Sequence, residues 1–153
     1  MKLDLLAIAA HPDDVELGCS GTLINEIKRG KKVGIVDLTQ GELGTRGTIE
    51  TRYQEAADAA KIMGLAAREN LKMRDGFFKN DEEHQLQVIQ ILRKYQPEIV
   101  IANILEDRHP DHGRAGQRLQ QLGRQVNRRA VATGAVADLA RVRLGERDQF
   151  PGV

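Results

Sequence analysis

Two short segments of this chain place imidazole and carboxylate groups directly after apolar runs. Residues 5–10 are apolar throughout and are followed by His11-Pro12-Asp13-Asp14. Residues 99–104 form a second, largely apolar run, and His109-Pro110-Asp111-His112 follows it. Histidine nitrogens and carboxylate oxygens are the ligands of catalytic zinc sites, which leave one position open for water or substrate.

The spacing within these segments predicts a metal centre assembled from both. His11 and Asp14 lie three residues apart across a turn that Pro12 stiffens, so both side chains can face one cation. His112 would supply the third ligand, and zinc would lower the pKa of a bound water towards ~7, giving a nucleophile at neutral pH. Iron(II) is the alternative metal, because two histidines and one carboxylate also suit it.

The remaining polar side chains of the two segments have candidate catalytic roles. Asp13 adjoins the ligands and could take a proton from water as general base. Its alternative role is to cap the following helix. His109 could donate a hydrogen bond to an oxyanion or a proton to a leaving amine. Asp111 could orient His109 or His112 through a hydrogen bond.

Two further residues of metal-binding type are interpreted as structural. Cys19 lies in the segment Gly18-Cys19-Ser20-Gly21, where packing is favoured over metal ligation. His84 lies in a polar stretch and is expected to be a solvated surface residue. With a single cysteine, the chain forms no intrachain disulfide.

A regular alternation of apolar and amphipathic stretches surrounds these segments. Strands are predicted over residues 3–10, 33–39, 71–73 and 98–104, and helices over residues 21–29, 50–63 and 81–95. This alternation predicts an α/β fold with a Rossmann-like, mostly parallel sheet and helices on both faces, in three layers. The carboxyl ends of the strands would then bring the two His/Asp segments together, where open α/β sheets bind ligands.

The composition restricts the classes of function. The 153 residues are expected to form one domain, and the formal net charge of +1 gives no electrostatic reason to bind nucleic acid or an anionic membrane. Aromatic residues make up 3% of the chain, which disfavours a base-stacking surface. No apolar run reaches the ~20 residues of a membrane span and no signal peptide is recognised, so a cytoplasmic location is expected.

The composition changes near residue 117. Residues 1–116 contain 11 Ile and 8 Lys, whereas residues 117–153 contain neither and are rich in Arg and Ala. The strand pattern does not resume there, and one helix is expected over residues 117–131. We therefore divide the chain into a core, residues 1–116, and a divergent tail, residues 117–153. The tail is either a surface helix with a ragged terminus or a segment foreign to the fold, such as the product of a shifted reading frame.

The motifs in both segments resemble those of a known enzyme family. Ala10-His11-Pro12-Asp13-Asp14, with Gly18 and Gly21-Thr22, and His109-Pro110-Asp111-His112 are similar to the signature of the zinc-dependent LmbE/PIG-L-like N-deacetylases. Within that family, residues 37–48 and 106–113 resemble the bacillithiol-pathway deacetylases, which remove acetyl from N-acetylglucosaminyl malate. The resemblance covers about residues 1–116.

The resemblance implies a role for each site residue. It implies that zinc is bound by His11, Asp14 and His112, that Asp13 is the base and that His109 assists at the oxyanion. It also implies contacts to the sugar from Arg52, Asp75 and Arg108. An arginine can fork towards hydroxyls or a carboxylate, although Arg52 could equally be a surface residue and Asp75 a turn former. The expected partner is a small amino sugar, and homo-oligomers are expected of longer relatives rather than of this chain.

Two rival interpretations belong to other classes. Known family members continue beyond this length with residues that help to close the pocket, so a truncated chain would keep a metal-binding half-fold without turnover. The other rival is a nucleotide-binding module on a Rossmann-like sheet. It is disfavoured because the first turn carries Asp13 and Asp14 instead of glycines, and two carboxylates would repel a pyrophosphate.

Overall fold

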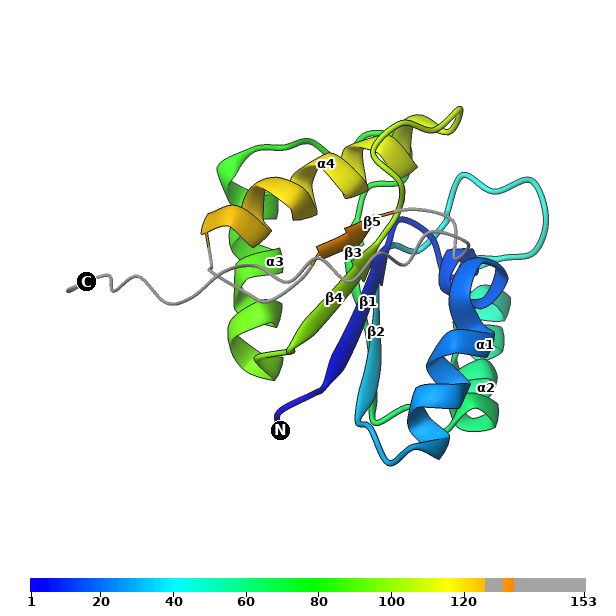
Figure 1. The fold of residues 1–153 in the computed structure, drawn as a ribbon. Coiled ribbons are helices and arrows are strands. Elements are labelled where there is room, and N and C mark those ends of the chain that lie inside the picture. Colours follow the sequence, from blue (N-terminus) through cyan, green and yellow to red (C-terminus); the bar gives the residue numbers. More distant parts are fainter. Residues whose placement is uncertain (126–130, 134–153) are drawn as a thin grey trace.

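The computed structural model describes residues 1–125 and 131–133, along which strands and helices alternate (Figure 1). The elements are β1 (Leu5–Ala9), α1 (Asp14–Lys28), β2 (Val33–Thr39), α2 (Ile49–Met63), β3 (Ala67–Met73), α3 (Glu82–Tyr95), β4 (Ile99–Ala102), α4 (Pro110–Gln125) and β5 (Val131–Thr133). The predicted α/β fold is confirmed.

The strands form one parallel sheet in the order β3-β2-β1-β4-β5. In the register, Leu5 of the central strand β1 lies between Val33 of β2 and Ile99 of β4. The chain builds outwards from β1 to β2 and β3 on one side, and later to β4 and β5 on the other. The order therefore reverses between β1 and β4. Open α/β sheets bind ligands at such a switch point, beyond the carboxyl ends of the strands, and we call this region the crevice.

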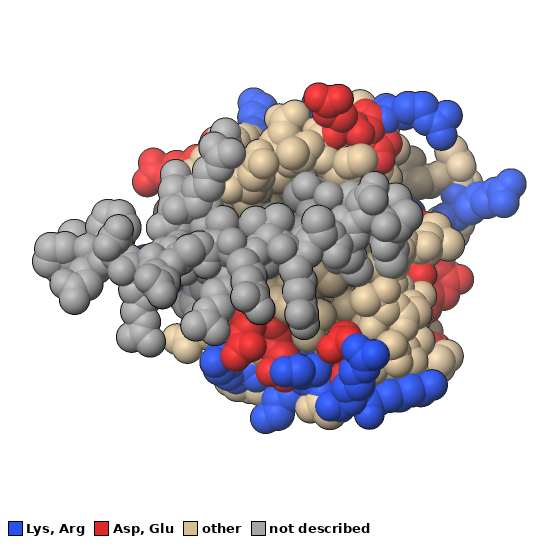
Figure 2. Space-filling model, in the orientation of Figure 1, with Lys and Arg blue, Asp and Glu red and all other residues tan. Residues whose placement is uncertain are grey.

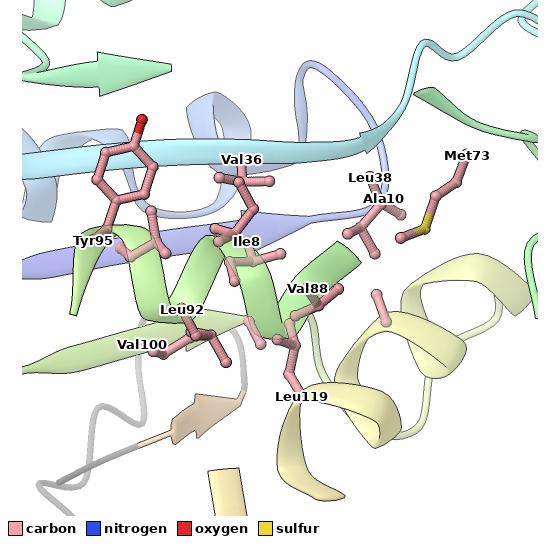
Figure 3. Close-up of a cluster of buried hydrophobic side chains, with 14 of the residues drawn as sticks. Ile8, Ala10, Val36, Leu38, Met73, Val88, Leu92, Tyr95, Val100 and Leu119 are labelled. Atoms are coloured by element: carbon pink, nitrogen blue, oxygen red, sulfur yellow. The ribbon is translucent and has the colours of Figure 1, made fainter. Parts of the chain in front are cut away.

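Helices cover both faces of the sheet, because the strands carry apolar side chains on both faces. Alternate residues of β1 point to opposite faces: Leu6 and Ile8 pack towards α3 and α4, and Leu5 and Ala7 pack towards α1 and α2. Figure 3 shows the first cluster, in which Ile8 and other sheet residues meet Val88 and Leu92 of α3 and Leu119 of α4. Full burial of such a side chain contributes about 1.5–3 kcal/mol, so these clusters hold the strand ends in place.

Local sequence signals set the bounds of the two middle helices. Thr48 caps α2: its hydroxyl accepts the N–H of Thr51, whose hydroxyl in turn accepts the N–H of Thr48. Gly64 ends α2 in the left-handed conformation that glycine adopts without strain. The Asp81 carboxylate accepts the N–H of His84 at the start of α3.

Three elements differ from the sequence prediction. Helix α1 begins at Asp14 instead of residue 21, because Gly18 and Gly21, which suggested a turn, lie within the helix with open space around them. Strand β3 begins at Ala67 instead of residue 71. It lies at the edge of the sheet, and its first residues are largely polar, so the apolar pattern of a strand is absent there. The last helix of the described residues is α4. It begins at Pro110, a residue favoured in the first helical turn, instead of residue 117.

The prediction that no further strand follows residue 117 was wrong. Residues Val131–Thr133 form β5, which pairs in parallel with β4. Helix α4 also continues without a break across the proposed boundary between residues 116 and 117. Residues 126–130 and 134–153 lie outside the described part, so the proposed foreign origin of the tail stays a prediction.

Two surface properties bear on partners. None of the described helices combines the length and the apolar character that crossing a bilayer requires. On the face shown in Figure 2, basic side chains gather along the lower edge, and acidic side chains lie next to them.

Candidate active site

The two His/Asp segments meet at the point where the strand order reverses. His11 follows β1, His109 precedes α4, and His112 lies in the first turn of α4. The ring centroids are 4.8 Å apart for His11 and His109, 5.4 Å for His11 and His112, and 4.7 Å for His109 and His112. The sheet therefore brings His11 next to two imidazoles, His109 and His112, that lie about one hundred residues later in the sequence.

Asp14, the first residue of α1, lies between two of these imidazoles. Its Oδ1 is 3.2 Å from Nε2 of His112, and its Oδ2 is 3.6 Å from Nδ1 of His11. Burial opposes ionisation of this carboxyl, but the hydrogen bond with His11 and the charge of His112 together lower its pKa. Asp14 is therefore held as a carboxylate, the form that binds a metal ion.

His11 is buried among carboxylates. Its Nε2 is 3.0 Å from Oδ1 of Asp75 and 3.5 Å from Oδ2 of Asp111. Burial disfavours the charged imidazole, but Asp14 and Asp75 outweigh it and raise the pKa of His11 to about 9. Binding of a metal to His11 would therefore release a proton, because only a neutral imidazole nitrogen can be a ligand.

The donors in this crevice fit a divalent metal. Within the described residues, His11, His109 and His112 can offer ligand atoms within 4.8 Å of one another, and so can His11, Asp75 and Asp111. Asp14 adds an ionised carboxylate between His11 and His112. Imidazole nitrogens together with a carboxylate are the donors of catalytic zinc and iron(II) sites.

Asp13 stands at the exposed edge of the crevice beside Arg52. The side chain of Asp13 is 51% exposed, and its Oδ2 accepts a hydrogen bond of 3.1 Å from Nη2 of Arg52. No side-chain cap hydrogen bond is formed by Asp13 at the start of α1, so the alternative role as a helix cap is not supported. Arg52 also donates to the carbonyl oxygen of Gly41, which fixes its guanidinium across the loop.

That loop, residues 40–48, is built closely around Arg52. A Cβ on Gly41 would lie 2.5 Å from Nη1 of Arg52, and one on Gly44 would lie 2.6 Å from the same atom. Gly41 also has φ +63°, a conformation that glycine tolerates best. The glycines of the loop therefore make room for the arginine that holds Asp13.

The other two predicted sugar contacts lie in different surroundings. Asp75 is 6% exposed, and its two oxygens face His11 and the backbone N–H of Leu43. Arg108 is exposed in the loop between β4 and α4. Direct contact of these residues with a sugar stays a prediction.

The carboxylate of Asp111 does not contact His109 or His112, but the backbone N–H of Asp111 donates to Nδ1 of His109 at 3.4 Å. Its carboxylate accepts hydrogen bonds from Gly76 N–H and Arg114, both at 2.8 Å, and faces His11 instead of His109 or His112. The first turn of α4 points the side chain of Asp111 back into the core, where it is fully buried, so the hydrogen bond to His109 comes from the backbone instead of the carboxylate.

Sequence reasoning missed two residues that touch the cluster. Asp107 is the partner of His112: its Oδ2 lies 3.1 Å from Nδ1 of that ring. Asn103, directly after β4, contacts both Ala10 and Asp14. The spacing of Asp107 from His112 is not a recognisable motif, but the position of Asn103 at the end of a buried strand was a usable signal.

Of the two residues interpreted as structural, Cys19 has the expected surroundings and His84 is less exposed than expected. Cys19 packs against the apolar cluster beneath α1, and burial raises the pKa of its thiol to about 11. The side chain of His84, which was expected to be solvated, is 20% exposed and is paired with Asp81 near the start of α3.

Beside the crevice, a buried ion network connects four elements. Arg68 of β3 donates to both oxygens of Asp37 of β2, at 3.0 and 3.1 Å, and also to Glu16 of α1 and the carbonyl of Ala56 in α2. Burial raises the pKa of Asp37 to about 6 against the lowering effect of Arg68, and the negative charges of Glu16 and Asp14 add smaller increases. Arg68 and Asp37 also border a cavity of about 140 Å³ that reaches Pro12.

An α/β sheet with imidazoles and carboxylates at its switch point is a typical enzyme architecture. Residues 6–122 match the family model described as PIG-L, GlcNAc-PI de-N-acetylase. The chain therefore belongs to the PIG-L family.

Similar proteins include deacetylases. The chain is 32% identical to the uncharacterized deacetylase YaiS of Escherichia coli, over 71% of this chain and 61% of that protein. It is 30% identical to the diacetylchitobiose deacetylase of Thermococcus kodakarensis, over 73% of this chain and 46% of that protein. The chain thus spans about half to three-fifths of the length of these curated relatives.

Solved structures show the same fold. A conserved protein of Thermus thermophilus superposes with a TM-score of 0.77 and 38% identity, over 97% of this chain and 69% of that one. An N,N'-diacetylchitobiose deacetylase from Pyrococcus horikoshii superposes with a TM-score of 0.71 and 30% identity, over 76% of this chain and 48% of that one.

Proposed function

We propose that this chain is a zinc-dependent N-deacetylase that hydrolyses the N-acetyl group of an N-acetylglucosamine-type substrate, yielding acetate and a free amine. The observation that carries the proposal is the position of the Asp14 carboxylate between His11 and His112, next to the exposed carboxylate of Asp13. The similarity to diacetylchitobiose deacetylases supports it.

His11, Asp14 and His112 would hold the metal, as two imidazoles and one ionised carboxylate. Bound there, zinc would polarise a carbonyl and lower the pKa of water. Iron(II) fits the same donors and is the alternative metal.

The other residues of the crevice would move protons and orient the amide. Asp13 takes a proton from the attacking water, and Arg52 holds its carboxylate towards the crevice. His109 stacks on His112 and donates to the oxyanion that forms at the acetyl carbon, or to the leaving amine. The C–N bond then breaks, acetate keeps the oxygen of the water, and the amine leaves with a proton.

For the substrate, we propose N-acetylglucosaminyl malate, as in bacillithiol biosynthesis. Two arginines beside the crevice, Arg52 and the exposed Arg108, carry the charge that would suit the malate carboxylates. Asp75 lies deeper, beside His11, where it is the candidate partner for sugar hydroxyls.

The test combines metal content with acetate release from N-acetylglucosaminyl malate and from N,N'-diacetylchitobiose. His112→Ala should lose both zinc and turnover, whereas His84→Ala, on α3 away from the cluster, should keep both. A His112→Ala variant that stays loaded and active would contradict the ligand assignment. Zinc without turnover in the unaltered chain would indicate the inactive metal-binding half-fold instead.

A further inference from the structure

Asn103 links the two strand ends that frame the metal-binding crevice. It follows β4 directly, across the switch point from the end of β1. Its Oδ1 accepts the backbone N–H of Ala10 at 2.9 Å, and its Nδ2 donates to Oδ2 of Asp14 at 3.2 Å. One planar amide thus touches both the end of β1 and the first residue of α1.

The contact with Ala10 fixes which way the amide faces. Ala10 is fully buried, and its N–H can only donate, so the group that faces it must be the amide oxygen. The NH2 group then has to point towards Asp14. No other arrangement satisfies the N–H of Ala10 and the carboxylate together.

The two oxygens of Asp14 therefore have different surroundings. Oδ2 accepts two hydrogen bonds, from the backbone N–H of His11 at 3.1 Å and from Asn103. Oδ1 faces Nε2 of His112 at 3.2 Å. We propose that Asn103 is a positioning residue that binds Oδ2 so that Oδ1 stays directed at the metal site; this rests on the proposed function.

Helix α4 holds Asn103 in this position. A Cβ on Gly116 would lie 2.5 Å from the carbonyl oxygen of Asn103, so the helix and the end of β4 are in direct backbone contact. The same helix carries His112. Asn103 therefore fixes Asp14 relative to the helix that supplies another proposed ligand.

Binding both the N–H of Ala10 and the carboxylate of Asp14 requires an amide side chain of this length. Aspartate keeps an oxygen for Ala10 but lacks the N–H donor, and it places a like charge against Asp14. Alanine lacks both groups. Aspartate at position 103 therefore removes only the contact with the Asp14 carboxylate, whereas alanine also removes the contact with the end of β1.

The test measures binding of Zn²⁺ by chelator competition and the absorption spectrum of bound Co²⁺. Asn103→Ala should bind Zn²⁺ about 10- to 100-fold more weakly, the usual cost of losing a partner of a metal ligand. Asn103→Asp, which keeps the acceptor for Ala10 and so should fold, should shift the Co²⁺ spectrum because Asp14 is turned. Thr39→Val is the control: it removes a 2.9 Å hydrogen bond to the carbonyl of Ala10, at the same strand end, and one of 3.2 Å from the N–H of Gly41, without touching Asp14.

The outcomes separate this inference from the proposed function. If the unaltered chain binds neither metal, the proposed function fails and the role of Asn103 fails with it. If the unaltered chain binds Zn²⁺, but Asn103→Ala matches it within about twofold and Asn103→Asp leaves the Co²⁺ spectrum unchanged, only the role of Asn103 is overturned. A loss of Zn²⁺ affinity in Thr39→Val equal to that in Asn103→Ala would also overturn it, since general loosening of the strand end would then explain both.

Discussion

Gly116 and Asn103 approach each other so closely that α4 has room only for a glycine at this point. A Cβ there would lie 2.5 Å from the carbonyl oxygen of Asn103 and 2.7 Å from that of Ile104. Both obstacles are backbone atoms, which cannot turn aside as a side chain can. The distance between α4 and the end of β4, and hence the position of His112, depends on this glycine.

Gly116→Ala should therefore destabilise the fold, although alanine is the better helix former. We expect a loss of about 1–3 kcal/mol in the free energy of unfolding, the usual cost of overpacking. Denaturant unfolding measures it. The matched control is Gly18→Ala in α1, where a Cβ meets nothing within 4 Å and the substitution should be neutral or stabilising. Equal effects of the two substitutions would contradict the close approach.

Gly44→Ala should impair catalysis more than stability. The added Cβ would lie 2.6 Å from Nη1 of Arg52, the far end of a flexible side chain that can move away at little cost, and 3.0 Å from the carbonyl oxygen of Gly41. Arg52 would then lose its place beside Asp13, and a misplaced catalytic group can cost about 100-fold in rate. The measurements are kcat/KM for acetate release and the melting temperature. Arg46→Ala, an exposed change in the same loop, should leave both unchanged.

Asp37 should make the fold more stable as the pH falls towards 4. Its folded-state pKa of about 6 is higher than the unfolded value of 3.8, so between these pH values the folded chain keeps a proton that the unfolded chain lacks. That proton favours the folded state. The resulting gain in the free energy of unfolding is complete below about pH 4 and is lost as the pH rises through about 6.

Comparison with Asp37→Asn isolates this contribution. The stability of the unaltered chain relative to the variant should rise by up to about 3 kcal/mol from pH 7.5 to pH 4, at about 1.4 kcal/mol per unit of pKa shift. Unfolding curves at several pH values measure it. Asp58→Asn is the control of opposite sign, because hydrogen bonds from Gln54 and Lys61 lower the pKa of that exposed carboxyl. A difference that is constant with pH would rule out the raised pKa of Asp37.

Asp107→Asn should weaken metal binding by acting on His112. Oδ2 of Asp107 lies 3.1 Å from Nδ1 of His112, so the carboxylate favours the tautomer that leaves Nε2 free as a ligand. We expect about tenfold weaker binding of Zn²⁺, at the low end for such partners because this pair is partly exposed. Glu106→Gln is the matched control on the neighbouring exposed residue. Unchanged Zn²⁺ affinity in Asp107→Asn would show that the ring is held by its packing alone.

The sequence predicted the elements better than the contacts between them. Strand β2 and helix α2 were found almost to the residue, because one is rich in β-branched residues and the other ends at Gly64. The start of helix α1 was predicted too late in the sequence, because two glycines that suggest a turn lie inside the helix. The meeting of the two His/Asp segments followed from parallel strand order, but the contact between His11 and Asp75 joins residues with no periodic relation in the sequence.

The surroundings of Asp75 pose a choice between two roles that one variant can decide. As a sugar contact, Asp75 would act on the substrate directly; as a partner of Nε2 of His11 at 3.0 Å, it would act through a proposed metal ligand. Asp75 is 6% exposed and also accepts the N–H of Leu43, so the second role fits its burial better. In Asp75→Asn we therefore expect Zn²⁺ affinity to fall by about 10-fold or more, with kcat lowered alongside it. A raised KM with unchanged Zn²⁺ affinity would instead support the sugar contact, because lost ground-state binding raises KM alone.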